Sequence, residues 1–137
     1  MVKDLYMGID IGSVTVKIVL SDENGNLFKG TWLRNQGSPI ESVKKGLTNL
    51  KKELVEEGVF DNLNILAVGT TGSARYLIKS VVGGDIAKTE IIAHAVAALH
   101  EFPDVHTILE IGGQDSKIII LKDGIVSDFA MNSVCAA

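Results

Sequence analysis

Two stretches of the chain repeat each other one hundred positions apart. IDIGSVTVKIVL, residues 9–20, aligns with LEIGGQDSKIII, residues 109–120. The matched pairs keep their chemistry: Asp10 with Glu110, Gly12 with Gly112, and Lys17 with Lys117. Such a match predicts a duplicated architecture, in which two similar domains each open on a β-hairpin whose first strand ends in an acid.

Alternating apolar residues predict strands on both sides of the first bend, at residues 5–11 and 14–20. Asn24-Gly25 is a strong signal for a tight hairpin turn, so a third strand is expected over 26–33. The chain is therefore predicted to open as a three-stranded antiparallel meander.

The rest of the chain alternates helices and strands. Ser38-Pro39 and Glu41 form a capping box before apolar residues at helical spacing, so a helix is expected to run to about Glu57 and to end at Gly58. Further patterns predict a strand at 64–68, a turn at 69–72, a helix at 73–82, an extended piece at 85–89, a helix at 90–100, and strands at 106–111, 116–122 and 125–130.

Composition narrows the class of protein. Of 137 residues, 46% are hydrophobic and only 5% aromatic, which is typical of a layered α/β fold with aliphatic strands. The net charge of -4 and the lack of a basic run argue against nucleic-acid or membrane-surface binding. No segment resembles a secretory signal or a membrane span, and the single cysteine fits a reducing compartment, so we expect a cytoplasmic protein.

The repeated bends have the chemistry of a phosphate site. Glycine lets backbone N–H groups converge on an anion, and a carboxylate beside such a loop is favourable when a hydrated Mg²⁺ lies between them. Two such loops facing each other would clamp the β- and γ-phosphates of a nucleotide. An ordinary hairpin with an incidental acid explains either bend alone, whereas the matched pair favours a nucleotide site.

Five motifs extend this interpretation along the chain. They are MGIDIGSVTVK at the start, GTTGSAR at 69–75, EIIAHAVAA at 90–98, TILEIGGQDSK at 107–117 and FAMNSVCAA at the end. In this order they resemble the actin, sugar-kinase and heat-shock-protein ATPase superfamily. The resemblance is closer to the ATP-dependent activators of 2-hydroxyacyl-CoA dehydratases and the related benzoyl-CoA reductase ATPase subunits.

The resemblance implies an α/β, ribonuclease H-like (actin-like ATPase) fold with a mixed sheet, followed by the first strands of a second similar domain. It places a first subdomain at 1–103 and a truncated second subdomain at 104–137. The family continues beyond the position of Ala137 with a glycine-rich loop and the rest of the second domain. We therefore expect an N-terminal piece of a longer protein, one that hydrolyses ATP weakly or not at all by itself.

The same resemblance implies a function. In this family a homodimer holds a bridging 4Fe-4S cluster, and ATP binding and hydrolysis drive one electron to a partner dehydratase or reductase. Cys135 stands where the family places a cluster ligand, although a lone cysteine is also common as a small buried hydrophobic residue. A dimer of this chain would offer two thiolates, fewer than the usual four.

On the first loop, Asp10 is the expected ligand of Mg²⁺ through water. Backbone amides and a hydroxyl are expected to bind phosphate from Gly12, Ser13, Val14 and Thr15. Lys17 either contacts the nucleotide or is only a solvated strand residue.

On the second loop, Gly112 and Gly113 are the expected amide donors, and Gln114 and Asp115 are candidates to orient the attacking water. Glu110 is an expected cofactor-binding residue near Mg²⁺, and it replaces the more usual aspartate of the family with a side chain one methylene longer, which changes where its carboxylate oxygens can reach.

Some interpretations stay open. Residues 70–72 either approach the nucleotide cleft or lead into a helix that Ser73 caps. Two other functions compete with the activator: a small-molecule kinase of the same superfamily acting on a sugar or short acid, and a non-catalytic module used as a scaffold for docking or dimerisation.

Overall fold

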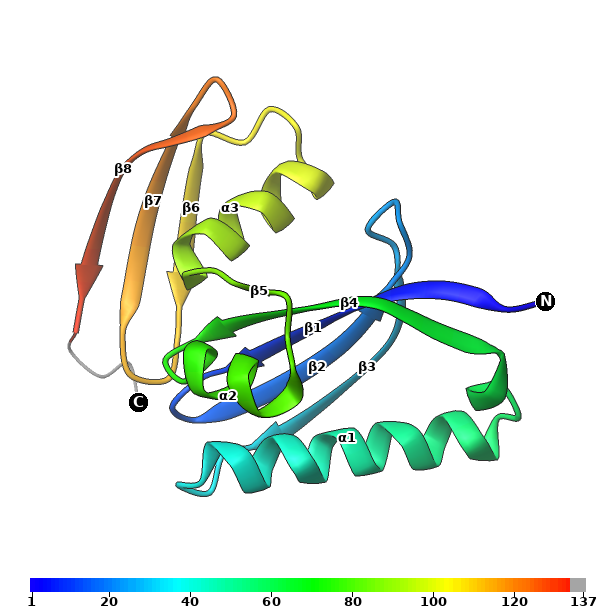
Figure 1. The fold of residues 1–137 in the computed structure, drawn as a ribbon. Helices are drawn as coiled ribbons and strands as arrows, with labels where there is room; N and C mark the ends of the chain where they lie inside the picture. The colour runs from blue at the N-terminus through cyan, green and yellow to red at the C-terminus, as the bar shows by residue number, and fades with distance from the viewer. Residues whose placement is uncertain (134–137) are drawn as a thin grey trace. The chain divides into compact units, whose positions relative to one another are not determined.

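Two contact-defined units, Met1–Lys88 and Thr89–Ala137, make up the chain. The computed structural model describes residues 1–133, and Figure 1 traces both units. The subdomains predicted at 1–103 and 104–137 have other bounds than these contact-defined units, and that division stays a prediction.

The first unit is built on a mixed five-stranded sheet with the order β3-β2-β1-β4-β5. Its strands are β1 (Lys3–Ile11), β2 (Thr15–Ser21), β3 (Leu27–Arg34), β4 (Leu63–Gly72) and β5 (Ile86–Ala87). The first three strands pair antiparallel, whereas β4 pairs parallel with both β1 and β5. The predicted meander and mixed sheet are confirmed.

Helix α1 (Pro39–Glu56) covers one face of this sheet (Figure 1). The Ser38 side chain accepts a hydrogen bond from the Glu41 amide, as the capping box predicts. Apolar residues of α1 pack on the strands in one core, which contains Val43, Leu50 and Leu54 of the helix and Val16, Ile18 and Leu20 of β2. A Cβ on Gly46 would lie 2.8 Å from Ile18 Cδ1, so this glycine lets the helix approach the sheet closely.

Strand β4 is longer than the sequence predicts. The turn predicted at 69–72 is wrong, because the strand continues to Gly72 in parallel register with β1, where Gly72 pairs with Ile11. Local propensity assigns this glycine- and threonine-rich segment to a turn, but pairing with β1 along its whole length, and with β5 at Gly69 and Thr70, keeps it extended. The 3-10 turn η1 (Phe60–Asn62) before β4 has no counterpart in the prediction.

Helix α2 (Arg75–Val82) begins later than predicted. Its N-cap is Ala74, which makes no side-chain capping bond. Ser73 instead donates its hydroxyl to the carbonyl of Ile11 at 3.3 Å, so the interpretation of Ser73 as a helix cap is wrong. Gly83 ends α2 in the left-handed conformation.

The second unit contains α3 (Glu90–Glu101) and a three-stranded antiparallel sheet in the order β6-β7-β8. The strands are β6 (Thr107–Ile111), β7 (Ser116–Lys122) and β8 (Ile125–Asn132), as predicted to within two residues at each end. Ala95 of α3 packs with Ile119 and Leu121 of β7 in a small core. None of the helices within residues 1–133 is long and apolar enough to cross a membrane.

The two sheets repeat the same strand pattern but bury opposite faces. In the first unit, Ile9 and Ile18 are 1% and 0% exposed beneath α1. Their counterparts in the repeat, Leu109 and Ile118, are 73% and 38% exposed. In the second unit α3 packs on the other face of the sheet, through Ile119, within the residues that the structure describes.

Gly72→Ala is expected to destabilise the first unit strongly. Gly72 has a φ of +97°, and a Cβ there would lie 2.2 Å from the carbonyl oxygen of Ile11. Gly58→Ala is a matched control, since Gly58 has a φ of +71° and open space around it. Urea unfolding should show a loss of at least about 3 kcal/mol for Gly72→Ala and of only about 1–2 kcal/mol for Gly58→Ala. Equal losses would contradict the close approach of β4 to β1.

Candidate functional site: two acidic hairpin turns

The first turn joins β1 to β2 and begins two residues after Asp10. The Gly12 amide donates to the carbonyl of Thr15 at 2.9 Å, next to the last paired residues of the two strands, Ile11 and Val16. A Cβ on Gly12 would lie 3.0 Å from that carbonyl oxygen, so the turn is tight enough to favour glycine. The predicted residues 12–15 therefore lie together in one tight bend.

Asp10 and Lys17 face each other across the strands that lead into this turn. Lys17 Nζ lies 3.0 Å from Asp10 Oδ2, and the two side chains are 46% and 30% exposed. Lys17 thus has a charged partner on β1 while its own side chain stays exposed, so a contact of Lys17 with the nucleotide stays a prediction. An ion pair this exposed adds little stability, and a hydrated cation could replace the ammonium group at the carboxylate without a large cost.

Thr71 lies beside Asp10 on the neighbouring strand, in direct register across β1 and β4. Its hydroxyl oxygen is buried and has no hydrogen-bond partner within residues 1–133. A buried polar atom without a partner is uncommon and is typical of a position where a ligand or water binds. Thr70, in contrast, is satisfied, because its hydroxyl donates to the carbonyl of Arg75 at 2.8 Å.

The second turn reproduces the geometry of the first. The Gly112 amide donates to the carbonyl of Asp115 at 2.8 Å, and Glu110 faces Lys117 across β6 and β7. The same hydrogen bond and the same acid–lysine pair thus recur one hundred positions later. The structural repeat that the sequence predicts is confirmed at the level of individual contacts.

Lys117 differs from Lys17 in its burial and in its partners. Its side chain is 5% exposed, and its Nζ lies 3.2 Å from Glu110 Oε2 and 2.6 Å from Asp115 Oδ1. Burial alone would lower the pKa of Lys117, but the hydrogen bonds to Asp115 and Glu110 outweigh it, so the pKa is raised. The second turn is therefore held by a buried ammonium group between two carboxylates.

Two residues of the site were missed by the sequence analysis. His94 of α3 places Nε2 4.0 Å from Glu110 Oε1, a contact that no local pattern could show. Asn35 follows β3, and its side-chain amide donates to the carbonyl of Gly12 at 2.9 Å. Asn35 followed by Gly37 is typical of a turn in which the asparagine side chain binds nearby backbone, and that signal was available.

The predicted site residues fall into two groups. Asp10, Lys17 and residues 12–15 surround the first turn, and Glu110 and residues 112–115 surround the second. The turns belong to different units, so their approach to one another stays a prediction. Cys135 lies outside the described residues, and residues 1–133 contain no cluster of three or more histidine, cysteine, aspartate or glutamate side chains that could hold a metal ion.

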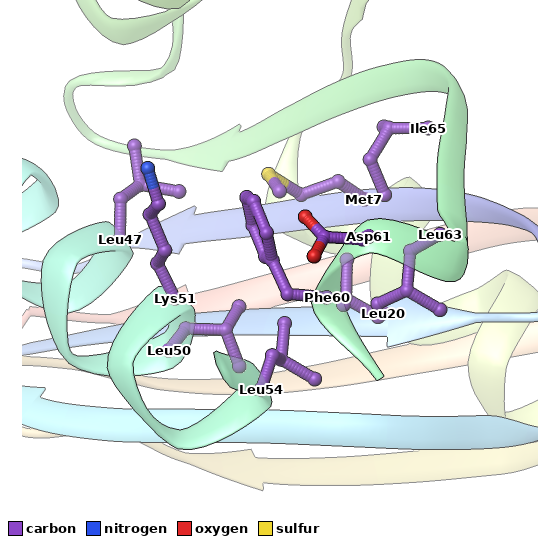
Figure 2. Close-up of a pocket in the computed structure, with 10 residues that line it drawn as sticks. All are labelled: Met7, Leu20, Leu47, Leu50, Lys51, Leu54, Phe60, Asp61, Leu63 and Ile65. Carbon is purple, nitrogen blue, oxygen red and sulfur yellow. The ribbon is translucent and has the colours of Figure 1, made fainter. Parts of the chain in front are cut away.

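A pocket elsewhere in the first unit is chemically different. Figure 2 shows it between α1, η1, β1, β2 and the start of β4. Leucine, isoleucine, methionine and phenylalanine side chains line it, with Lys51 and Asp61 as its charged residues. None of the predicted site residues lines this pocket, so it is separate from the acidic turns.

The comparison with known protein families decides the assignment. The BadF/BadG/BcrA/BcrD ATPase family matches residues 7–137 of the chain. The chain belongs to this ATPase family. Membership agrees with the paired acidic turns, and the fold is that of actin-like ATPases, as the sequence predicts.

Similar proteins agree with this family. The (R)-2-hydroxyglutaryl-CoA dehydratase activating ATPase of Acidaminococcus fermentans is 35% identical over 136 residues, which cover 96% of this chain and 48% of that protein. The activator of lactoyl-CoA dehydratase from Anaerotignum propionicum is 30% identical, with 96% of this chain and 48% of that protein covered.

A solved structure is also similar, the activator of 2-hydroxyisocaproyl-CoA dehydratase from Clostridium difficile with bound ADPNP. It matches with a TM-score of 0.79 and 28% identity, over 97% of this chain and 47% of that one. The chain thus spans about half the length of the relatives that it matches.

Lys117→Met is expected to destabilise this family member at neutral pH. The substitution leaves Glu110 and Asp115 without their shared cation, at a cost of about 1.5–3 kcal/mol of unfolding free energy. Because the pKa of Lys117 is raised on folding, its contribution is complete below the ordinary value of 10.5 and is lost as pH rises through the folded value.

Urea unfolding between pH 7 and pH 11 measures this dependence. The difference between wild type and Lys117→Met should shrink at the alkaline end, whereas the exposed Lys122→Met control should stay close to wild type throughout. A constant difference up to the highest pH would contradict the proposed cause.

Proposed function

We propose that this chain forms the phosphate-binding part of an ATPase that activates a 2-hydroxyacyl-CoA dehydratase or a similar reductase. The observation that carries the proposal is the pair of equivalent acidic turns, each closed by one glycine amide and each flanked by a lysine. Membership of the ATPase family and relatives named as dehydratase activators support it.

The first turn is the proposed site of Mg²⁺ and the terminal phosphates. Asp10 offers a carboxylate, the ligand type that Mg²⁺ prefers, and would hold the ion through water. The buried Thr71 hydroxyl without a partner lies beside Asp10 and fits an additional polar contact to the same ligand. Amides of residues 12–15 would bind phosphate oxygens, and bound Mg²⁺ would neutralise charge on the phosphates.

The second turn is proposed to bind the same nucleotide from the opposite side. Gly112 and Gly113 would donate backbone amides, and Gln114 and Asp115 would orient the attacking water. Glu110 would act near the metal, with Lys117 and His94 setting the charge around it. This arrangement needs the domains at 1–103 and 104–137 to close on one nucleotide.

ATP hydrolysis is proposed to be coupled to electron transfer from an iron–sulfur cluster. Cys135 would contribute one ligand to a 4Fe-4S cluster in a homodimer, and the cluster, when bound, would supply a single low-potential electron to the acyl-CoA enzyme. The names of the relatives support a dehydratase as the partner. A cytoplasmic protein that binds neither nucleic acid nor membrane remains our expectation.

Asp10→Asn is expected to weaken Mg-ATP binding roughly ten- to a hundredfold, because the amide is a poorer partner for hydrated Mg²⁺. Asp4→Asn makes the same charge change at the other end of β1 and should bind as wild type does. Calorimetry on the 137-residue chain measures both.

The structure also leads to a prediction for the affinity of the wild-type chain for Mg-ATP. We expect a dissociation constant above about 1 μM and little hydrolysis, since the chain spans about half of its relatives and a cleft half formed excludes water poorly. Sub-micromolar binding would contradict this weak-binding prediction, and equal affinities of Asp10→Asn and wild type would contradict the role of Asp10.

The cluster is tested on the full-length protein. Anaerobic reconstitution with iron and sulfide should give the broad visible absorption of a 4Fe-4S centre, and Cys135→Ser should reduce its iron content. A colourless wild-type protein that still binds ATP would instead favour the small-molecule kinase, and one that binds neither would favour the scaffold.

A further inference from the structure

We propose that Asn35 is the positioning residue of the first phosphate loop, and that it aims the amides of the loop toward the nucleotide. This inference rests on the proposed nucleotide site and adds a residue to it. Asn35 stands between β3 and α1 and is close to the loop only in the folded chain. No ligand contact is assigned to it.

Asn35 binds the loop at two carbonyl groups. Its side-chain Nδ2 donates to the carbonyl of Gly12 at 2.9 Å, and its backbone amide donates to the carbonyl of Val14 at 2.8 Å. The carbonyl of Thr15 is occupied as well, since it accepts the amide of Gly12. Three carbonyl groups of the bend are therefore held by protein donors.

Holding these carbonyls sets the direction of the amides. In a planar trans peptide the C=O of one residue and the N–H of the next point in opposite directions. With the carbonyls of Gly12 and Val14 directed at Asn35, the amides of Ser13 and Thr15 point away from it. A phosphate is attracted by N–H groups and repelled by carbonyl oxygens, so this orientation suits an anion.

Asn35 is itself fixed. Its Oδ1 accepts hydrogen bonds from the Gly37 amide at 3.2 Å and from the Ser42 hydroxyl at 3.3 Å. Ser42 is buried in the first turns of α1, so the side-chain amide of Asn35 is anchored to the helix that covers the sheet. Because two donors occupy Oδ1, the NH₂ group is the side that faces Gly12.

Asn35→Asp separates the contact with the loop from the structural contacts. The substitution keeps the size of the side chain and an oxygen for Gly37 and Ser42, but it removes the donor to Gly12. We expect Mg-ATP to bind about ten- to a hundredfold more weakly, as for other residues that hold a binding group without touching the ligand. AMP has no β- or γ-phosphate and should lose little affinity.

Gln36→Glu is the matched control. It adds the same negative charge one residue away, on an exposed side chain, and should keep the wild-type ratio of ATP to AMP affinity. NMR titration measures weak binding of both nucleotides, and circular dichroism checks that each variant is folded. A general loss of structure would weaken the binding of ATP and AMP alike and would not change the ratio of their affinities.

The outcomes distinguish the inference from the proposed function. If wild type binds Mg-ATP and Asn35→Asp keeps the wild-type ATP to AMP ratio, the inference is overturned and the nucleotide site stands. If wild type binds no nucleotide, the proposed function fails for this chain. The amide resonances of Ser13 and Thr15 then decide, because Asn35→Asp must shift them, and unchanged resonances would overturn the positioning role.

Discussion

One backbone hydrogen bond closes each acidic turn, and the site depends on it. The Gly12 amide binds the carbonyl three residues later, and Gly112 does the same in the second unit. Closing the bend this tightly brings the acid of the first strand and the lysine of the second face to face. A larger residue at the glycine would press on the carbonyl that accepts this bond, so the geometry explains why a glycine stands two residues after the acid in both copies.

The two turns have the same backbone hydrogen bond but differ in the charges and burial of their side chains. In the first, the exposed pair of Asp10 and Lys17 leaves the carboxylate accessible to a hydrated cation. In the second, buried Lys117 neutralises two carboxylates at once, and His94 adds a further group beside Glu110. We infer a division of labour, in which the first turn serves the metal and the second holds the loop that positions water.

The sequence predicted what depends on local pattern. Period-two alternation, Asn24-Gly25 and the capping box at Ser38 correctly placed the meander and α1, and the repeat correctly predicted a strand–turn–strand unit at both acidic bends. The extension of β4 to Gly72 was missed because neighbouring strands, not its own residues, keep that segment extended.

Contacts between residues far apart in the sequence explain the other differences between the predicted and the observed structure. Ser73 binds Ile11 across strands, and Asn35 reaches Gly12 from beyond β3, so neighbouring residues reveal neither partner, and the spacing of Asn35 and Gly37 indicates only the local turn. The strand pattern shows which face of a sheet is apolar, but not which face a helix covers, and the exposed Leu109 illustrates the limit.

The most direct test of the account is whether both turns bind one nucleotide. A titration of the ¹⁵N-labelled chain with Mg-ADPNP follows the amides of residues 12–15 and 112–115 separately. The account predicts that both sets shift along saturation curves with one common dissociation constant. Shifts confined to one turn, or two unrelated dissociation constants, would contradict the claim that the repeated turns form a single phosphate site.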